Sequence, residues 1–275
     1  MLPSMDLLSP LKPARPARIG LFAIGLEAYW AQFPGLRERL EGYLRELEQR
    51  LASSGGTVIC AGLVDTAPRA AEAGALLAAS DLDLIFCHAA TYATSSQVLP
   101  VVQRARVPVV VLNLQPSPRL DYETCDTGEW LANCSACCVP EIANAFSRAR
   151  VPFQVISGML RDDPAPAREI GEWLAAARAW RSLRTSRIGF LGHTYPGMLD
   201  MYSDFTMISA QTGAHVEVLE MCDLERCLRE SLPEEADAIL RMTRETFVLE
   251  DCPEEDLQWA ARVAAALERL AKQFD

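Results

Sequence analysis

Short apolar runs alternate along the chain with longer stretches in which apolar residues recur every three or four positions. The short runs are rich in Val, Ile, Leu and Phe and have the length of buried strands, whereas the three-to-four spacing is typical of helices with one buried face. Such alternation predicts parallel β-α units. The pattern predicts strands at 18–24, 57–64, 83–88, 107–114, 153–157, 187–191 and 215–220.

The longer stretches predict helices. The clearest covers about 34–53, where five leucines share one face and Gly55 follows the last turn: Leu36, Leu40, Leu44, Leu47 and Leu51. We expect 115–129 to be irregular. Further helices are predicted at 68–79, 95–106, 140–149, 164–183, 202–211, 223–231, 233–247 and 253–274.

These elements divide into two α/β domains. We expect a disordered leader at 1–17, rich in proline, followed by a Rossmann-like domain with a parallel sheet at 18–183. The remaining 184–275 predicts a second, incomplete α/β domain, because two strands cannot cover three amphipathic helices. The expected fold class is therefore α/β, with a partial second domain.

Composition and charge argue against several classes of protein. Half of the 275 residues are hydrophobic and 23% are charged, so the chain can bury a core. The net charge of −11, with no basic stripe, argues against a nucleic-acid partner. No apolar run reaches the roughly 20 residues of a membrane span, and nine cysteines, an odd number, do not suggest a secreted disulfide framework. We expect a cytoplasmic protein.

Ligands of open parallel sheets bind beyond the carboxyl ends of the strands, so the loops there hold the candidate residues. After the first predicted strand, Glu27 stands beside the aromatic rings of Tyr29 and Trp30, a combination suited to a sugar. The alternative is that the rings pack under the next helix while Glu27 is solvated. No glycine-rich phosphate loop and no GxSxG or HExxH motif occurs.

Two histidines follow predicted strands at equivalent places. His88 ends the strand at 83–88, and His193 follows the strand at 187–191. Both are candidate ligand-binding residues, with a purely structural role as the alternative. They do not predict a metal site, since catalytic metals take about three protein ligands.

The segment 192–206, GHTYPGMLDMYSDFT, is dense in polar groups at a predicted strand-to-helix turn. Tyr195 and Asp200 are its further candidate binding residues. Ser203 and Asp204 could instead cap the helix that follows.

A cysteine cluster lies in EWLANCSACCVPEIANAF, 129–146. Cys134, Cys137 and Cys138 could bind zinc, undergo redox chemistry or simply pack in a tight turn. A single CxxC without a second ligand pair is a weak zinc signal, and packing is the favoured interpretation.

Three segments, IGLEAYW (24–30), 129–146 and 192–206, resemble the L-fucose/L-arabinose isomerase family of metal-dependent sugar ketol-isomerases. The resemblance extends from about residue 18 to the end. It implies an N-terminal Rossmann-like domain, a central α/β domain and a C-terminal β-rich domain. It also implies aldose–ketose interconversion through an enediol, usually with Mn²⁺, in an oligomer whose neighbouring subunits complete each site.

The same resemblance implies substrate contacts. Glu27, Tyr29 and Trp30 match the family's first sugar-contacting loop, and Asn133 and Cys134 lie in its second. Tyr195 lies in the central-domain loop. The family's metal ligands and proton-shuttling acids have no matching position here, so catalytic residues are unknown and we expect no Mn²⁺ to be bound by this chain alone.

We therefore expect the substrate-side domains of a sugar ketol-isomerase, inactive without the metal-binding domain. The alternatives are a stand-alone sugar- or polyol-binding module and, less favoured, a thiol-based protein. Apolar stripes on the last two predicted helices need a partner, which predicts a homo-oligomer or association with a missing catalytic domain or subunit.

Overall fold

The computed structural model describes residues 15–274, which form two compact units. One unit is Arg15–Arg181, and the other begins at Ser182, so the division falls in the last turn of helix α6 (Pro164–Arg184). Residues 1–14 of the predicted leader lie outside the described residues. Ala17, at the end of that leader, is fully buried and its carbonyl accepts a hydrogen bond from the Thr57 amide at 2.8 Å, so the ordered fold begins earlier than expected.

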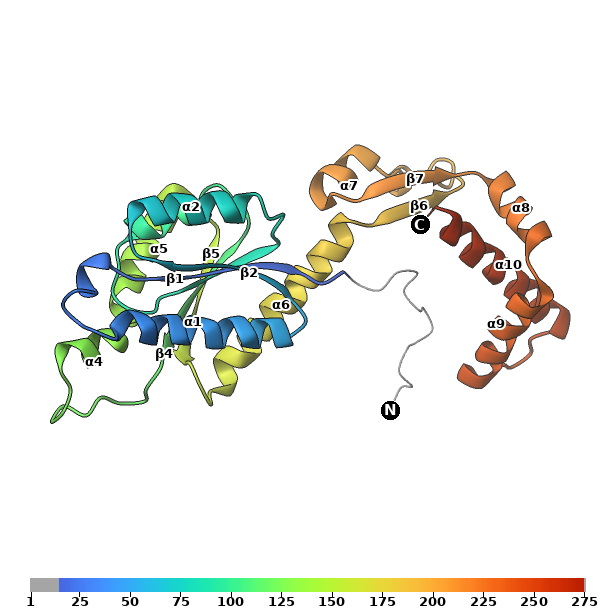
Figure 1. Ribbon diagram of the computed structural model, residues 1–275. Helices are drawn as coiled ribbons and strands as arrows, with labels where there is room; N and C mark the ends of the chain where they lie inside the picture. The colour runs from blue at the N-terminus through green and yellow to red at the C-terminus, as the bar shows by residue number, and fades with distance from the viewer. Residues whose placement is uncertain (1–14, 275) are drawn as a thin grey trace. The chain divides into compact units, whose positions relative to one another are not determined.

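The first unit contains a five-stranded parallel sheet with the order β2-β1-β3-β4-β5 (Figure 1). This confirms the Rossmann-like α/β fold. The order is that of doubly wound sheets of the flavodoxin type, in which the chain switches direction between the first and third strands and ligands bind beyond that point. The strands are β1 (Arg18–Ile24), β2 (Thr57–Val64), β3 (Leu84–His88), β4 (Val109–Gln115) and β5 (Phe153–Met159).

Helices cover both faces of this sheet because successive strand residues point to opposite sides. Leu84 and Phe86 of β3 pack in the core with α1 (Leu36–Ser53) and α6, while Ile85 and Cys87 face the other side. That second face is covered by α2 (Ala67–Ala78), α3 (Leu99–Val102) and α5 (Val139–Ala149). Figure 1 labels α2 and α5 on that face.

The predicted leucine face of α1 is confirmed, since every one of those five leucines is buried against the sheet. Helix α2, on the opposite face, begins where Thr66 Oγ1 accepts a hydrogen bond from the Arg69 amide at 3.3 Å. A side-chain acceptor at this position satisfies an amide that has no partner within the helix.

Two parts of the sequence prediction were wrong in this unit. The helix expected at 95–106 is broken into a single 3-10 turn, η2 (Ser95–Gln97), and the short α3. Pro100 has no amide hydrogen and interrupts the helical hydrogen bonds there. Conversely, α4 (Thr127–Ala132), whose N-cap is Asp126, begins within the last three residues of the stretch 115–129 expected to be irregular.

The second unit has a parallel pair of strands, β6 (Arg187–Leu191) and β7 (His215–Leu219). Between residues 182 and 274 no further strand occurs, in agreement with the expected shortage of sheet. Its buried cluster is small and comprises Leu219, Leu224, Cys227, Ala266 and Leu270. The helices are α7 (Phe205–Thr212), α8 (Met221–Glu230), α9 (Pro233–Thr246) and α10 (Glu254–Gln273).

Candidate functional site

The loop after β1 is anchored by Trp30. Its Nε1 donates to Asp65 Oδ2 at 2.8 Å, at the end of β2, and the Glu27 amide donates to the Asp65 carbonyl at 3.3 Å. A Cβ on Gly25 would lie 2.9 Å from the Trp30 ring, so the indole packs directly on the glycine backbone. Trp30 thus holds the loop in place, while the side chain of Glu27 is exposed.

Tyr29 presents a protonated phenol at the carboxyl edge of the sheet. Its ring meets those of Trp30 and Phe33 edge-on, with centroids 6.4 and 6.2 Å apart. Burial, and then the neighbouring Tyr92 and the cysteine thiols, raise the pKa of Tyr29 above its ordinary value. The hydroxyl therefore remains a hydrogen-bond donor in neutral solution.

His88 is the last residue of β3 and is almost completely buried. Its Nδ1 lies 3.4 Å from the Leu112 carbonyl, and burial lowers the pKa of His88 to about 4, so the imidazole is neutral at neutral pH. A carbonyl can only accept, which places the imidazole proton on Nδ1 and leaves Nε2 as an acceptor. No partner for Nε2 exists among the described residues.

Asn133, directly after α4, carries a second buried hydrogen-bond acceptor, its side-chain oxygen Oδ1. Its side-chain Nδ2 donates two hydrogen bonds to Glu129, one to the carbonyl oxygen at 3.0 Å and one to Oε1 at 3.1 Å. Glu129 is itself held by both terminal nitrogens of Arg39 on α1, and that hydrogen bond lowers the pKa of Glu129. Within the described part of the chain, the buried Asn133 Oδ1 has no partner.

Hydrogen bonds join the strand ends to α4 and to the turn that follows it. Thr91 Oγ1, just after β3, donates to the Leu131 carbonyl at 2.8 Å, and Ser135 Oγ donates to Asn113 Oδ1 of β4 at 3.1 Å. The structure therefore brings Tyr29, His88, Asn133 and Cys134 to one edge of the sheet. This is the edge at which the strand order predicts a ligand.

The cysteines line the α4–α5 turn. Cys134 Sγ and Cys137 Sγ are 2.6 Å apart, whereas Cys138 Sγ points to the Thr91 carbonyl at 3.6 Å. Burial raises the pKa of the Cys134 thiol to about 12 and that of Cys138 to about 11. Cys138 thus packs in the core, as the favoured interpretation of the cluster has it.

His193, Tyr195 and Asp200 lie together in the exposed loop that follows β6, in the second unit. Asp200 is in a 3-10 turn, η4 (Leu199–Met201), and Tyr195 is 68% exposed. The capping alternative is confirmed for Asp204, whose Oδ1 accepts from the Met207 amide at 2.9 Å to start α7.

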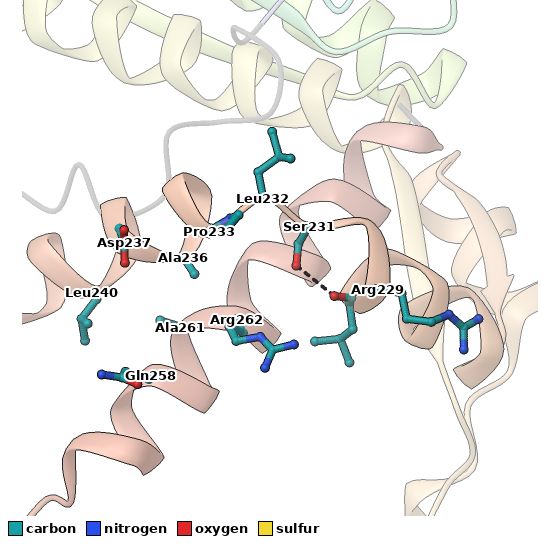
Figure 2. Close-up of a pocket in the computed structure, with 11 residues that line it drawn as sticks. Arg229, Ser231, Leu232, Pro233, Ala236, Asp237, Leu240, Gln258, Ala261 and Arg262 are labelled. Atoms are coloured by element: carbon teal, nitrogen blue, oxygen red, sulfur yellow. Dashed lines mark hydrogen bonds between the residues drawn. The ribbon is translucent and has the colours of Figure 1, made fainter.

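A hollow of about 450 Å³ lies within the second unit, between the α8–α9 connection and helix α10 (Figure 2). Apolar side chains such as Leu232 and Leu240 alternate around it with Asp237, Gln258 and Arg262. In the described residues, buried polar side-chain atoms without partners occur only at the carboxyl edge of the first unit. That edge is therefore the stronger candidate site.

Three residues of the site were not singled out from sequence. Arg39 and Glu129 orient Asn133, and Asp65 holds Trp30. Glu129 had a recognisable signal, since Asp126 followed three residues later by a glutamate is typical of a helix start. Arg39 and Asp65 had none, because their roles depend on segments far away in the chain.

No group of three or more His, Cys, Asp or Glu side chains within 15–274 is placed to hold a metal ion. Nor is any helix described there both long enough and apolar enough to cross a membrane. No protein-family model matches the chain, and no curated protein matches it.

Proposed function

We propose that this chain binds a small, neutral, hydroxyl-rich ligand of the sugar or polyol class at the carboxyl edge of its five-stranded sheet. The observation that carries the proposal is the pair of buried acceptors without partners, His88 Nε2 and Asn133 Oδ1. Buried polar atoms are almost always hydrogen-bonded, and one left alone costs about 1–3 kcal/mol. A ligand with two or more hydroxyl donors would satisfy both.

The charges near the site favour a neutral ligand. His88 is uncharged at neutral pH, and the guanidinium of Arg39 is already engaged by Glu129. The loop after β1 carries the carboxylate of Glu27 and no glycine-rich phosphate cradle. The half-buried ring of Tyr29 and the 39% exposed ring of Tyr92 supply apolar surface for the CH groups of a sugar.

We further propose that this binding serves a protein of the L-fucose/L-arabinose isomerase type. The support is the resemblance of 24–30, 129–146 and 192–206, the first two of which contribute Tyr29 and Asn133 to the edge described above. The described residues do not fit a Mn²⁺ site, since no three suitable side chains converge. We therefore derive no isomerisation step and propose the substrate-binding part alone.

Calorimetric titration tests the binding. L-fucose, L-arabinose and the corresponding polyols are titrated into the parent chain and into Y29F and H88F, which each remove one hydrogen-bonding group. Loss of one such bond should weaken binding about three- to tenfold. Y122F is the matched control, because Tyr122 is 86% exposed on the loop before α4 and its hydroxyl faces solvent.

Two results would overturn the proposal. One is that no sugar or polyol gives a heat of binding in the calorimeter or a chemical-shift change in a parallel NMR titration. The other is binding that is equally strong in the parent, Y29F and H88F. A parallel assay measures ketose formation with added Mn²⁺ and distinguishes an active isomerase from a protein that only binds the sugar. Binding without turnover is the result expected of the substrate-binding part.

A further inference from the structure

The turn between α4 and α5 places two thiols face to face. Cys134 Sγ and Cys137 Sγ are 2.6 Å apart, and Cys137 Sγ also lies 3.7 Å from the Cys134 carbonyl. The backbone between them is helical at Ser135 and continues into a 3-10 turn, η3 (Ala136–Cys138). Residues three apart in such a turn are on the same side, so a bond between these sulfurs needs no large backbone movement.

The turn is held rigid by its neighbours. The Ser135 side chain, between the two cysteines, is buried and donates to Asn113 Oδ1 of β4 at 3.1 Å. Cys138 points away, to the carbonyls of Thr91 and Ser135 at 3.6 and 3.5 Å. The pair is thus preorganised, and the third thiol takes no part in it.

The two thiols differ in their access to solvent. Cys137 is exposed, whereas Cys134 is buried and only 7% exposed. Burial and the adjacent Cys137 raise the pKa of the Cys134 thiol to about 12, so Cys134 keeps its proton until a partner accepts it. An accessible thiol in front of a shielded one is the arrangement of an attacking and a resolving cysteine.

We propose that Cys134 and Cys137 form a reversible redox pair that closes to an intramolecular disulfide by exchange with a small disulfide of the glutathione type. The Cys137 thiol gives up its proton, and the resulting thiolate attacks one sulfur of the small disulfide and expels one thiolate, which takes up a proton; this gives a mixed disulfide. Cys134 Sγ then attacks Cys137 Sγ, its proton passes to the second departing thiolate, and the protein disulfide forms. Two protein thiols are oxidised, and one small disulfide is reduced to two thiols.

The geometry favours this over the other chemistries of a CxxC segment. A metal centre would need a third ligand, and the described residues supply none in place. The closed ring would span only four residues, so it stabilises the fold little and remains open to exchange.

Intact-mass and peptide mass spectrometry of the full chain test the proposal. The reduced protein is incubated with oxidised glutathione in a C125S background, because Cys125 shares the tryptic peptide 120–148 with the pair. We expect loss of two hydrogens, no retained glutathione on that peptide and full reversal by dithiothreitol. C134S should retain one glutathione on Cys137, and C137S should retain none at Cys134.

C138S is the matched control. It should form the Cys134–Cys137 disulfide as the background protein does, since Cys138 faces Thr91 rather than the pair. Stable glutathione on Cys137 of a protein that keeps the Cys134 thiol would overturn the proposal. So would a peptide that remains fully reduced while the exposed Cys222 and Cys252 are modified. Circular dichroism of each variant confirms that the fold is retained.

Discussion

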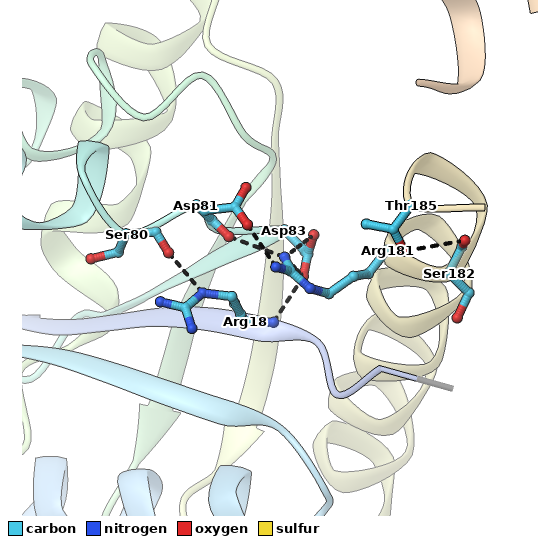
Figure 3. A network of polar contacts seen from close by, with 7 residues as sticks. All are labelled: Arg18, Ser80, Asp81, Asp83, Arg181, Ser182 and Thr185. Carbon is cyan, nitrogen blue, oxygen red and sulfur yellow. Dashed lines mark hydrogen bonds and ion pairs between the residues drawn. The ribbon is translucent and has the colours of Figure 1, made fainter. Parts of the chain in front are cut away.

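Arg181 and Asp83 form a buried ion pair that ties helix α6 to the start of strand β3 (Figure 3). Arg181 Nη1 lies 3.1 and 3.0 Å from the two carboxylate oxygens, and the two side chains are 9% and 0% exposed. Asp83 also accepts the Arg18 amide at 2.8 Å, and Arg181 Nη2 donates to Asp81 Oδ2 at 2.6 Å. The guanidinium therefore holds the Asp83 carboxylate, and Asp83 in turn holds the amino end of β1, so both strands are linked to the last helix of the unit.

Replacing Arg181 by methionine should strongly destabilise the first unit. R181M removes the guanidinium from a buried carboxylate, and breaking a buried pair in this way costs about 3–5 kcal/mol. R178M on the same helix is the control. Arg178 makes a 3.0 Å bond to the Ser54 carbonyl near the surface, and its loss should cost about 1 kcal/mol or less.

Urea denaturation followed by tryptophan fluorescence measures both variants. Four of the five tryptophans belong to the first unit, so a W259F background makes the signal report on that unit alone. Equal midpoints for R181M and R178M would contradict the role given to the pair.

Two glycines in helices should respond in opposite ways to alanine. A Cβ on Gly74 of α2 would lie 2.4 Å from the Pro100 carbonyl oxygen, whereas nothing lies within 4 Å of one on Gly171 of α6. G74A should therefore destabilise the unit by about 1–3 kcal/mol through overpacking. G171A should stabilise it by about 0.5–1 kcal/mol, because alanine restricts the unfolded chain and favours helix. The same fluorescence assay measures both, and a stabilising G74A would refute the close approach of α2 to Pro100.

Acid should weaken the first unit through His88. Burial lowers the pKa of His88 to about 4, and the unfolded side chain titrates near pH 6.5. Between these values the unfolded state binds one more proton than the native state, so stability falls as the pH is lowered from about 6.5 to 4. The total is about 3 kcal/mol, since each pH unit contributes about 1.4 kcal/mol per proton.

The comparison of H88Q with the parent isolates this contribution from that of the carboxylates. The free energy of unfolding is measured at half-unit steps from pH 7 to 4. Its slope against pH should be smaller in H88Q than in the parent, by the amount that corresponds to about one bound proton. H193Q removes an exposed imidazole from the second unit and is the control. Parallel profiles for H88Q and the parent would show that His88 is not buried as a neutral side chain.

The second unit should self-associate. Its surface exposes Leu232, Phe247, Val248 and Trp259 by 56, 54, 88 and 55%. Exposed apolar groups of this size mark contact surfaces, and a second copy of the chain is one partner always present. Multi-angle light scattering across a concentration series should give a mass above that of one chain, and the double variant F247S/V248S should lower it. A single-chain mass for the parent at every concentration would contradict this.

The sequence was most informative where the signal is local. The leucine spacing of 36–51 predicted α1 and its buried face, and the apolar runs located all five strands of the first unit to within two residues. It failed at 95–106, where Pro100, which has no amide hydrogen, interrupts a helical pattern. It also overlooked α4, because six residues are too few for a hydrophobic period.

The sequence by itself thus determined the α/β class, the strands and most helices, since side-chain periodicity depends on neighbours along the chain. Only the tertiary structure decided the strand order, the burial of His88 Nε2 and Asn133 Oδ1, and the support of Asn133 by Arg39 through Glu129. Arg39 and Glu129 are 90 positions apart, and nothing local in the chain encodes such a contact. It exists only because α1 and α4 pack on the same side of the sheet.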